Sequence, residues 1–526
     1  MMNININPVH CEGLNCFEDI LITIASHYKI EYRLAFSGAW GFEFKPLEAS
    51  NNLLLGERIG NDVRNLTNLL YKYCNVEVVR FDSGEPIEEL KIIRKYLVQE
   101  IPIGVFIDTF WCPWLHGRYQ RVHDVHHCLI IGIDEDNNLY CLDPALNLNI
   151  SVLWYNDFIN GFKNCVKYEF NVINENHDYL ELLKESTAKL NDKKFYNDIR
   201  VFAKEFKDSF DFKLEYQKFN VDVWYVLIDR NLRLIAAGRT LYAEFIELVS
   251  KELESDKLLD VKYQLQKVAS KWNMIRGILT KSYRKGCCHD VKEKVYYILN
   301  EISDFEENLI YNLYQIVNSN QYIKKEKNLP ILNDLGLLNN TEIVALNLAD
   351  SLNNKAFVAN EDDTFKADLT GTGQFFIPNG LEQEQSIQVN GMYFKLPPLI
   401  TEEYDNISCA GQKINIEKSI YQSIMFLGCA DNGDFLDEAT IFFETGEELK
   451  IPISFTDSWR LPKFNESIAW TGIGGKWADD RFEVHSNEQR IFAREDLIGK
   501  QGIIEAIKLP DCSNIHIFSI SLRKLT

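Results

Sequence analysis

A cysteine near the N-terminus and a later group of histidines have the types and spacing that suggest chemistry. Cys11 stands in VHCEGLNCFEDILITIASHY, at the mouth of an expected helix, and four of the ten histidines lie at positions 116, 123, 126 and 127. Asp143 follows on the next expected strand, in NLYCLDP. Papain-like cysteine chemistry requires a thiol, an imidazole and a carboxylate in such an order. These residues predict a catalytic triad of Cys11, His126 and Asp143.

Two cysteines compete for the role of nucleophile. The apolar residues Phe17, Ile20 and Ile24 mark the buried face of the expected helix. Cys11 would stand at or just before the first turn, where N–H groups and the helix dipole stabilise a thiolate. Cys16 has Ile20 four residues further on, so we expect it to point into the core as a structural thiol.

The choice between neighbouring histidines depends on the register of a hairpin. Side chains alternate across a strand, so His126 and His127 face opposite sides. If Ile133 pairs with Asn138, Asp143 lies one diagonal step from His126 and on its face. A slip of one residue would select His127 instead.

In the expected mechanism Cys11 attacks an acyl carbonyl, His126 carries the proton and Asp143 fixes the imidazole tautomer. The backbone N–H of Cys11 and the side chain of Asn5 or Asn7 are the candidate oxyanion donors.

A metal site is the competing interpretation of this segment. Cys112, His116, His123 and Cys128 cluster with His126, but they lack the paired ligand spacing of a structural zinc site. We therefore expect neither a metal nor a cofactor.

Composition bounds the partners. The chain has 526 residues, a net charge of −21 and a pI near 5.0, which disfavours nucleic acid and anionic membranes. No signal peptide or membrane-span pattern is recognisable, so a cytoplasmic protein is expected.

Three domains are expected, giving a multidomain α+β fold. Residues 1–177 mix a helix with strand-like runs, residues 178–345 have helical periodicity, and residues 346–526 have short strands bounded by turn residues. The last region predicts a β-sandwich of jelly-roll kind.

The segments HCEGLNCFEDILITIASHY, IPIGVFIDTFWCPW and HHCLIIGIDEDNNLYCLDP resemble, in order and spacing, the N-terminal domain of the butirosin-biosynthesis acyltransferase family. That family is itself similar to bacteriocin-processing cysteine peptidases. A weaker resemblance extends through AAGRTLYAEFIELV to about residue 320.

The resemblance implies a papain-like fold and an acyltransferase. Such an enzyme moves an acyl group from a phosphopantetheine thioester on a carrier protein, through an acyl-cysteine, to a small amine, in nonribosomal or aminoglycoside-type natural-product biosynthesis. It matches Cys11 to the nucleophile, His126 to the base and Asp143 to the orienting acid. Asp108 matches a recurring family aspartate that shapes the pocket or caps a strand.

Other features leave alternatives open. Trp111 and Trp114 are either a water-excluding wall of the site or core residues. Trp459, Trp470 and Trp477 either stack on a ligand or fill the sandwich core. The stretch KSYRK at 281–285 is a candidate docking surface for a carrier protein, and a homodimer is a further option. The alternative functions are a peptidase with the same triad and a non-catalytic binding protein.

Overall fold

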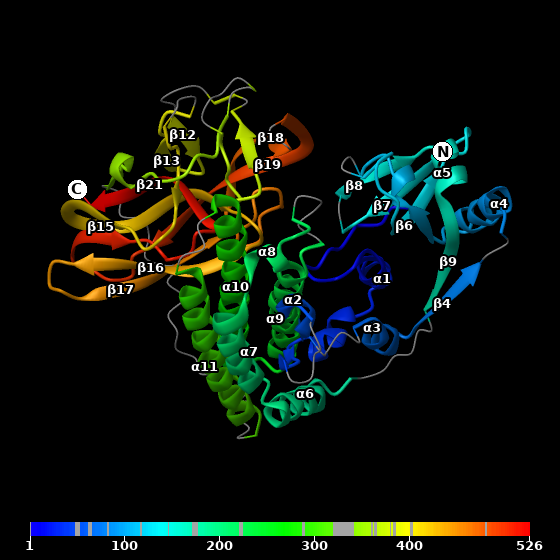
Figure 1. Cartoon of the computed structure of the whole chain (residues 1–526), viewed down its shortest axis with the longest axis horizontal. Helices are drawn as coiled ribbons and strands as arrows, with labels where there is room; N and C mark the ends of the chain where they lie inside the picture. The colour runs from blue at the N-terminus through cyan, green and yellow to red at the C-terminus, as the bar shows by residue number, and fades with distance from the viewer. Residues whose placement is uncertain are drawn as a thin grey trace.

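The computed structural model describes most of the chain (Figure 1). All structural statements refer to residues 2–47, 53–61, 66–81, 84–115, 118–145, 147–170, 177–219, 225–286, 290–318, 341–358, 361, 366–378, 380–381, 386–399, 403–478 and 481–525.

A largely antiparallel sheet organises the lobe at the right of Figure 1, in the order β4-β9-β5-β6-β7-β8, with β1 pairing to β6. Helices α4 and α5 cover one face through an apolar core that includes Ile93, Phe158 and Ile130. The elements are β1 (Met2–Asn3), β4 (Val76–Phe81), α4 (Pro86–Leu97), β5 (Ile103–Asp108), β6 (Val125–Ile133), β7 (Leu139–Asp143), β8 (Asn147–Leu153), α5 (Tyr155–Gly161) and β9 (Phe162–Phe170).

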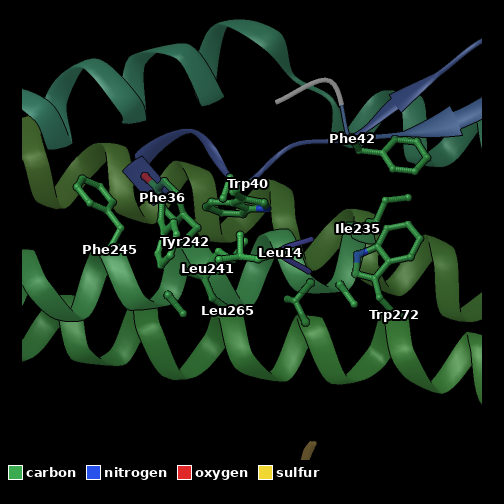
Figure 2. Close-up of a cluster of buried hydrophobic side chains, with 14 of the residues drawn as sticks. Leu14, Phe36, Trp40, Phe42, Ile235, Leu241, Tyr242, Phe245, Leu265 and Trp272 are labelled. Atoms are coloured by element: carbon green, nitrogen blue, oxygen red, sulfur yellow. The ribbon is translucent and has the colours of Figure 1, made fainter. Parts of the chain in front are cut away.

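The other face of this sheet contacts α1 (Cys16–His27), which joins the lobe to the helices. One apolar core runs from Leu129 of the sheet through Ile20 of α1 to the long helices. Figure 2 shows Trp40 and Phe42 from the N-terminal region packed against Tyr242 and Trp272. The boundary expected at residue 177 therefore does not divide this core.

Antiparallel helices form the centre of the molecule (Figure 1). Arg239 and Glu306 are fully buried among them and form an ion pair at 2.9 Å, to which Trp40 and Trp272 donate hydrogen bonds. The helices are α6 (Tyr179–Lys193), α7 (Tyr196–Ser209), α8 (Phe212–Glu215), α9 (Leu227–Glu252), α10 (Asp256–Lys285) and α11 (Val291–Asn318). Smaller elements follow α1 along the chain and precede β4. They are η1 (Tyr32–Gly38), β2 (Glu43–Phe44), α2 (Leu55–Arg58), β3 (Ile59–Gly60) and α3 (Leu66–Cys74).

A β-sandwich forms the C-terminal lobe, yellow to red in Figure 1, as the turn-bounded runs predict. The long strand β15 pairs with β20 through its first half and with β19 and β21 through its second. The elements are β10 (Thr341–Ala345), η7 (Ala349–Ser351), β11 (Gln374–Ile377), β12 (Ser386–Val389), β13 (Met392–Lys395), β14 (Ile407–Ser408), β15 (Lys413–Ala430), β16 (Phe435–Phe443), β17 (Glu448–Phe455), β18 (Ser467–Ala478), β19 (Arg481–Leu497), β20 (Ile503–Lys508) and β21 (Ile515–Leu525).

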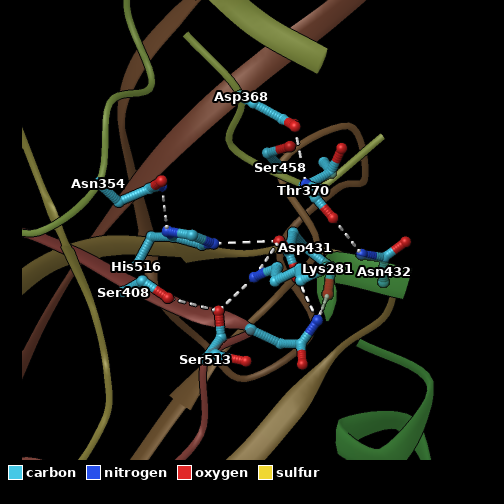
Figure 3. A network of polar contacts seen from close by, with 12 residues as sticks. Lys281, Asn354, Asp368, Thr370, Ser408, Asp431, Asn432, Ser458, Ser513 and His516 are labelled. Atoms are coloured by element: carbon cyan, nitrogen blue, oxygen red, sulfur yellow. Dashed lines mark hydrogen bonds and ion pairs between the residues drawn. The ribbon is translucent and has the colours of Figure 1, made fainter. Parts of the chain in front are cut away.

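A buried polar network fastens α10 to the sandwich (Figure 3). Lys281 of α10 forms an ion pair with Asp431 at 2.9 Å, and His516 contacts the same carboxylate at 3.1 Å. Arg284, one turn later, pairs with Asp368. Lys281 and Arg284, two of the cations in the candidate docking stretch 281–285, are thus paired within the chain.

The fold is mixed α and β with a C-terminal β-sandwich. None of the helices within the described ranges combines the length and apolarity that crossing a bilayer would demand.

Candidate active site

Helix α1 begins at Cys16, because a capping box fixes its first turn. The Asn15 side chain accepts hydrogen bonds from the N–H groups of Phe17 and Glu18, each at 3.0 Å, and Glu18 accepts one from the Asn15 N–H. Such reciprocal capping specifies a helix start. Cys16 therefore occupies the first helical position, where the helix dipole favours a negative charge on sulfur.

His126 lies at the start of strand β6 and contacts Asp143, the last residue of strand β7. The His126 Nε2 lies 2.6 Å from Asp143 Oδ2, and the indole N–H of Trp114 donates to the same oxygen at 2.7 Å. Asp143 is fully buried and His126 nearly so. Because Nε2 faces the carboxylate, Nδ1 is the ring nitrogen that remains available to the Cys16 thiol, which lies close enough to His126 to raise its pKa.

The surroundings of His126 favour its charged form. Burial alone disfavours an imidazolium, but the negative charge of Asp143 and the hydrogen bonds from Asp143 and Cys16 outweigh it and raise the pKa of His126 well above its usual value. A protonated His126 beside Cys16 would stabilise the thiolate.

Cys11, the expected nucleophile, occupies a different environment. Its backbone N–H donates to Asp19 at 3.1 Å, and its side chain packs against the helical core. Burial, with the negative charges of Asp19 and Glu244, raises the pKa of the Cys11 thiol far above its ordinary value. The thiol that raises the pKa of His126 is that of Cys16, expected from the sequence to be a core residue.

The hairpin places Asp143 on the face of His126, as expected, but its register differs from the predicted one. Ile133 pairs with Leu139, one residue from the expected Asn138, which alone would have selected His127. A register shift between Ile130 and Gly132 then cancels the slip. Beyond this β-bulge Leu129 pairs with Leu142, so Asp143 falls on the face of His126 as expected.

His127 is held apart from this chemistry. Its Nε2 contacts the Tyr168 hydroxyl at 2.5 Å, and its ring packs against Phe17 and Phe106. Burial lowers the pKa of His127 to about 3, so it stays neutral near pH 7.

Of the remaining predicted site residues, one contacts the His126–Asp143 pair and others lie elsewhere in the lobe. Trp114 joins the site through Asp143, whereas Trp111 packs against Phe110 and Gly161. Asp108 caps the 3-10 turn η3 (Thr109–Trp111) by accepting from the Phe110 N–H.

Asp108 also contacts His123 at 2.9 Å. Asn5 is exposed beside β6, and within the described residues no hydrogen bond joins its side chain to Cys11 or Cys16.

The alternative metal site finds no support among the residues whose placement is described, since no three ligand side chains gather there. Cys112 is buried and His123 stacks on Phe110. His116 lies outside the described residues.

The loop that leads into α1 is clamped by the other two parts of the chain. Glu12 lies 3.2 Å from Arg460 of the sandwich and 3.7 Å from Arg233 of α9. Gly13 has a φ of +92°, and a Cβ there would stand 2.3 Å from the Cβ of Ala237. The sandwich thus contacts the segment that positions Cys16.

The sandwich tryptophans are mainly structural. Trp470 and Trp477 are buried, packing against Phe376 and Phe375 respectively. Trp459 alone of the three is exposed, at 38%.

Sequence reasoning expected Cys11 to stand at or just before the first turn of this helix, whereas the structure has the first helical residue at Cys16. The signal that could have identified it is Asn15 followed three residues later by Glu18, a helix-start pattern that places Cys16, not Cys11, at the first turn.

Comparison with known proteins identifies one part of the chain. No curated protein matches the chain. Residues 341–526 match the family described as AziU2-like beta-sandwich domain, and the chain therefore carries this domain after its helices.

Proposed function

We propose that this protein is a cysteine-dependent acyltransferase in which Cys16 is the nucleophile. The observation that carries the proposal is the placement of Cys16 beside the buried His126–Asp143 pair. His126 contacts Asp143 at 2.6 Å, the Cys16 side chain raises the pKa of His126, and the thiol stands on the first residue of a helix. In this arrangement a thiol is activated by a base, and the base is oriented by a third group.

The first half-reaction acylates the enzyme. The Cys16 sulfur, whose proton is held by His126, attacks the carbonyl carbon of an acyl thioester, and the donor thiol leaves with that proton. The N–H of Cys16, the first of helix α1, has no intrahelical acceptor and can donate to the oxyanion.

The second half-reaction forms an amide. An amine attacks the acyl-cysteine and the carbon–sulfur bond breaks. The proposed donor is a carrier-protein phosphopantetheine thioester and the acceptor a small amine, as the family resemblance implies, in natural-product biosynthesis. Transfer rather than hydrolysis is the part of the proposal that rests most on that resemblance.

The test uses the two cysteines as a matched pair. Wild type, Cys16→Ala and Cys11→Ala are incubated with octanoyl-N-acetylcysteamine, and an acyl adduct is sought by intact mass. An alkylamine or diamine is then added.

We expect wild type and Cys11→Ala to form an adduct that moves to the amine, and Cys16→Ala to lose at least about a thousand-fold in turnover, as nucleophile removal does elsewhere. Adduct loss in Cys11→Ala with retention in Cys16→Ala would overturn the assignment. An adduct that yields only free acid would favour the peptidase alternative.

A further inference from the structure

A second histidine–carboxylate pair lies beside Cys16. The Nδ1 of His10 is 2.8 Å from Asp19 Oδ2, and Asp19 is fully buried. Asp19 is three residues after Cys16 on α1, so the two side chains are neighbours on the helix surface. Asp19 therefore holds His10 near the first turn of α1, where the proposed nucleophile lies.

The two pairs are close enough to interact. The negative charge of Asp143 acts on Asp19, and burial together with this charge raises the pKa of Asp19 against the opposing effect of His10. The pairs His126–Asp143 and His10–Asp19 thus lie in one region of the molecule, and in each pair the imidazole contacts a buried carboxylate.

The second ring nitrogen of His10, which does not contact Asp19, also requires a hydrogen-bond partner. Its Nε2 is buried and makes no hydrogen bond within the described part of the chain. Leaving a buried polar atom unpaired costs about 1–3 kcal/mol, so such an atom calls for an explanation.

Anchoring alone does not explain His10. The same segment is already tied to α1 by Thr23, whose hydroxyl accepts from the Val9 N–H at 3.0 Å and donates to the Val9 carbonyl at 3.1 Å. With Nδ1 donating to Asp19, Nε2 presents a lone pair, which is how an imidazole works as a general base.

We propose that His10 is a second general base, oriented by Asp19, that serves the amine in the second half-reaction; this inference rests on the proposed function of Cys16. The amine nitrogen bonds to the carbonyl carbon of the acyl-Cys16 thioester while its proton passes to His10 Nε2. The carbon–sulfur bond then breaks and its electron pair stays on the Cys16 sulfur. His10 releases the proton to solvent, and the sulfur takes one up to restore the resting thiol.

The experiment separates the two half-reactions. Release of N-acetylcysteamine from octanoyl-N-acetylcysteamine measures acylation, and decay of the isolated acyl-enzyme with added alkylamine measures aminolysis. Wild type is compared with His10→Gln, His10→Ala, Asp19→Asn and the matched control Thr23→Val. The control loosens the same segment but leaves the His10–Asp19 pair intact.

We expect His10→Gln to lower aminolysis at least ten-fold more than acylation, and Asp19→Asn to do so more weakly. Added imidazole should restore aminolysis to His10→Ala, and Thr23→Val should show no such difference between the two steps.

Equal loss in both steps, no loss in either, or a Thr23→Val profile like that of His10→Gln would overturn this inference alone. Absence of an acyl-enzyme in wild type would instead overturn the proposed function, and this inference with it.

Discussion

Two buried histidine–aspartate pairs in this molecule use the same chemical groups in opposite ways. In the N-terminal lobe His126 lies 2.6 Å from Asp143, and in the sandwich His516 lies 3.1 Å from Asp431. The pKa of His126 is raised, whereas burial and the charge of Lys281 lower the pKa of His516 although Asp431 opposes them.

The difference lies in the third partner. Lys281 pairs with Asp431 at 2.9 Å, and Asn354 contacts the other nitrogen of His516 (Figure 3). Asn406 contacts the same nitrogen at 2.9 Å. At Asp143 the partners are a neutral indole and the imidazole of His126, which the Cys16 thiol also influences. The pair that is proposed to act as a base is thus the one whose carboxylate has no lysine partner among the described residues, whereas Lys281 pairs with the carboxylate of the other.

The largest expected effect comes from disabling the first pair. Asp143→Asn keeps the size of the side chain but removes the charge that orients and stabilises His126, so turnover should fall by about 10³–10⁴-fold, as in other triads. Trp114→Phe, which removes one hydrogen bond to the same oxygen, should cost about ten-fold or less. Steady-state kinetics with thioester and amine measure both, and full turnover in Asp143→Asn would exclude the proposed role of this pair.

The second effect comes from breaking the structural pair. Lys281→Met leaves Asp431 buried without its cation and should lower the free energy of unfolding of the sandwich by about 3–5 kcal/mol. Urea unfolding followed by tryptophan fluorescence measures the change.

The control is Lys294→Met. Lys294 also joins a helix to the sandwich, through Asp511 at 3.1 Å, but both side chains are largely exposed. Its removal should cost less than about 1 kcal/mol. Equal losses in the two variants would show that Lys281 does not stabilise the sandwich as a buried charge.

The smallest expected effect is an opposite response of the two histidines to pH. The pKa of His126 is raised in the folded state, so its stabilisation is fully present below about pH 6.5 and is lost as the pH rises through the folded pKa. The pKa of His516 is lowered, so protonation of the unfolded chain removes stability as the pH falls below about 6.5.

Unfolding free energies of wild type, His126→Gln and His516→Gln across pH 5–8 provide the measurement. The advantage of wild type over His126→Gln should grow toward acid, and its advantage over His516→Gln should shrink. A parallel pH dependence in the two differences would remove the distinction between the pairs.

Local patterns in the sequence predict much of this fold. The runs at 101–108, 126–134 and 138–144 correspond to β5, β6 and β7, and the short turn-bounded runs after residue 346 form the sandwich. Periodicity and turn residues act over a few positions, so they can be read from the chain.

Long-range packing is less visible in the sequence. The core joins α1 and Trp40 to helices two hundred residues later, and no local composition change marks that union. The carboxylate and imidazole were predicted because strand parity is a local property. The β-bulge that keeps their faces aligned was not, because a register shift depends on packing across the whole sheet.

The start of helix α1 was predicted too early for a local reason. The spacing from Cys16 to Ile20 was read as a buried face, whereas the cap at Asn15 starts the helix at Cys16, and a first-turn side chain can lie at the edge of a core. The proposed choice of Cys16 over Cys11 therefore depends on where the helix begins.

The most direct test of the account is to locate the acyl group. Wild-type protein acylated with octanoyl-N-acetylcysteamine is digested, and its peptides are mapped by tandem mass spectrometry. The account predicts an octanoyl group on Cys16, with Cys11 unmodified. An octanoyl group on Cys11, with Cys16 unmodified, would contradict it.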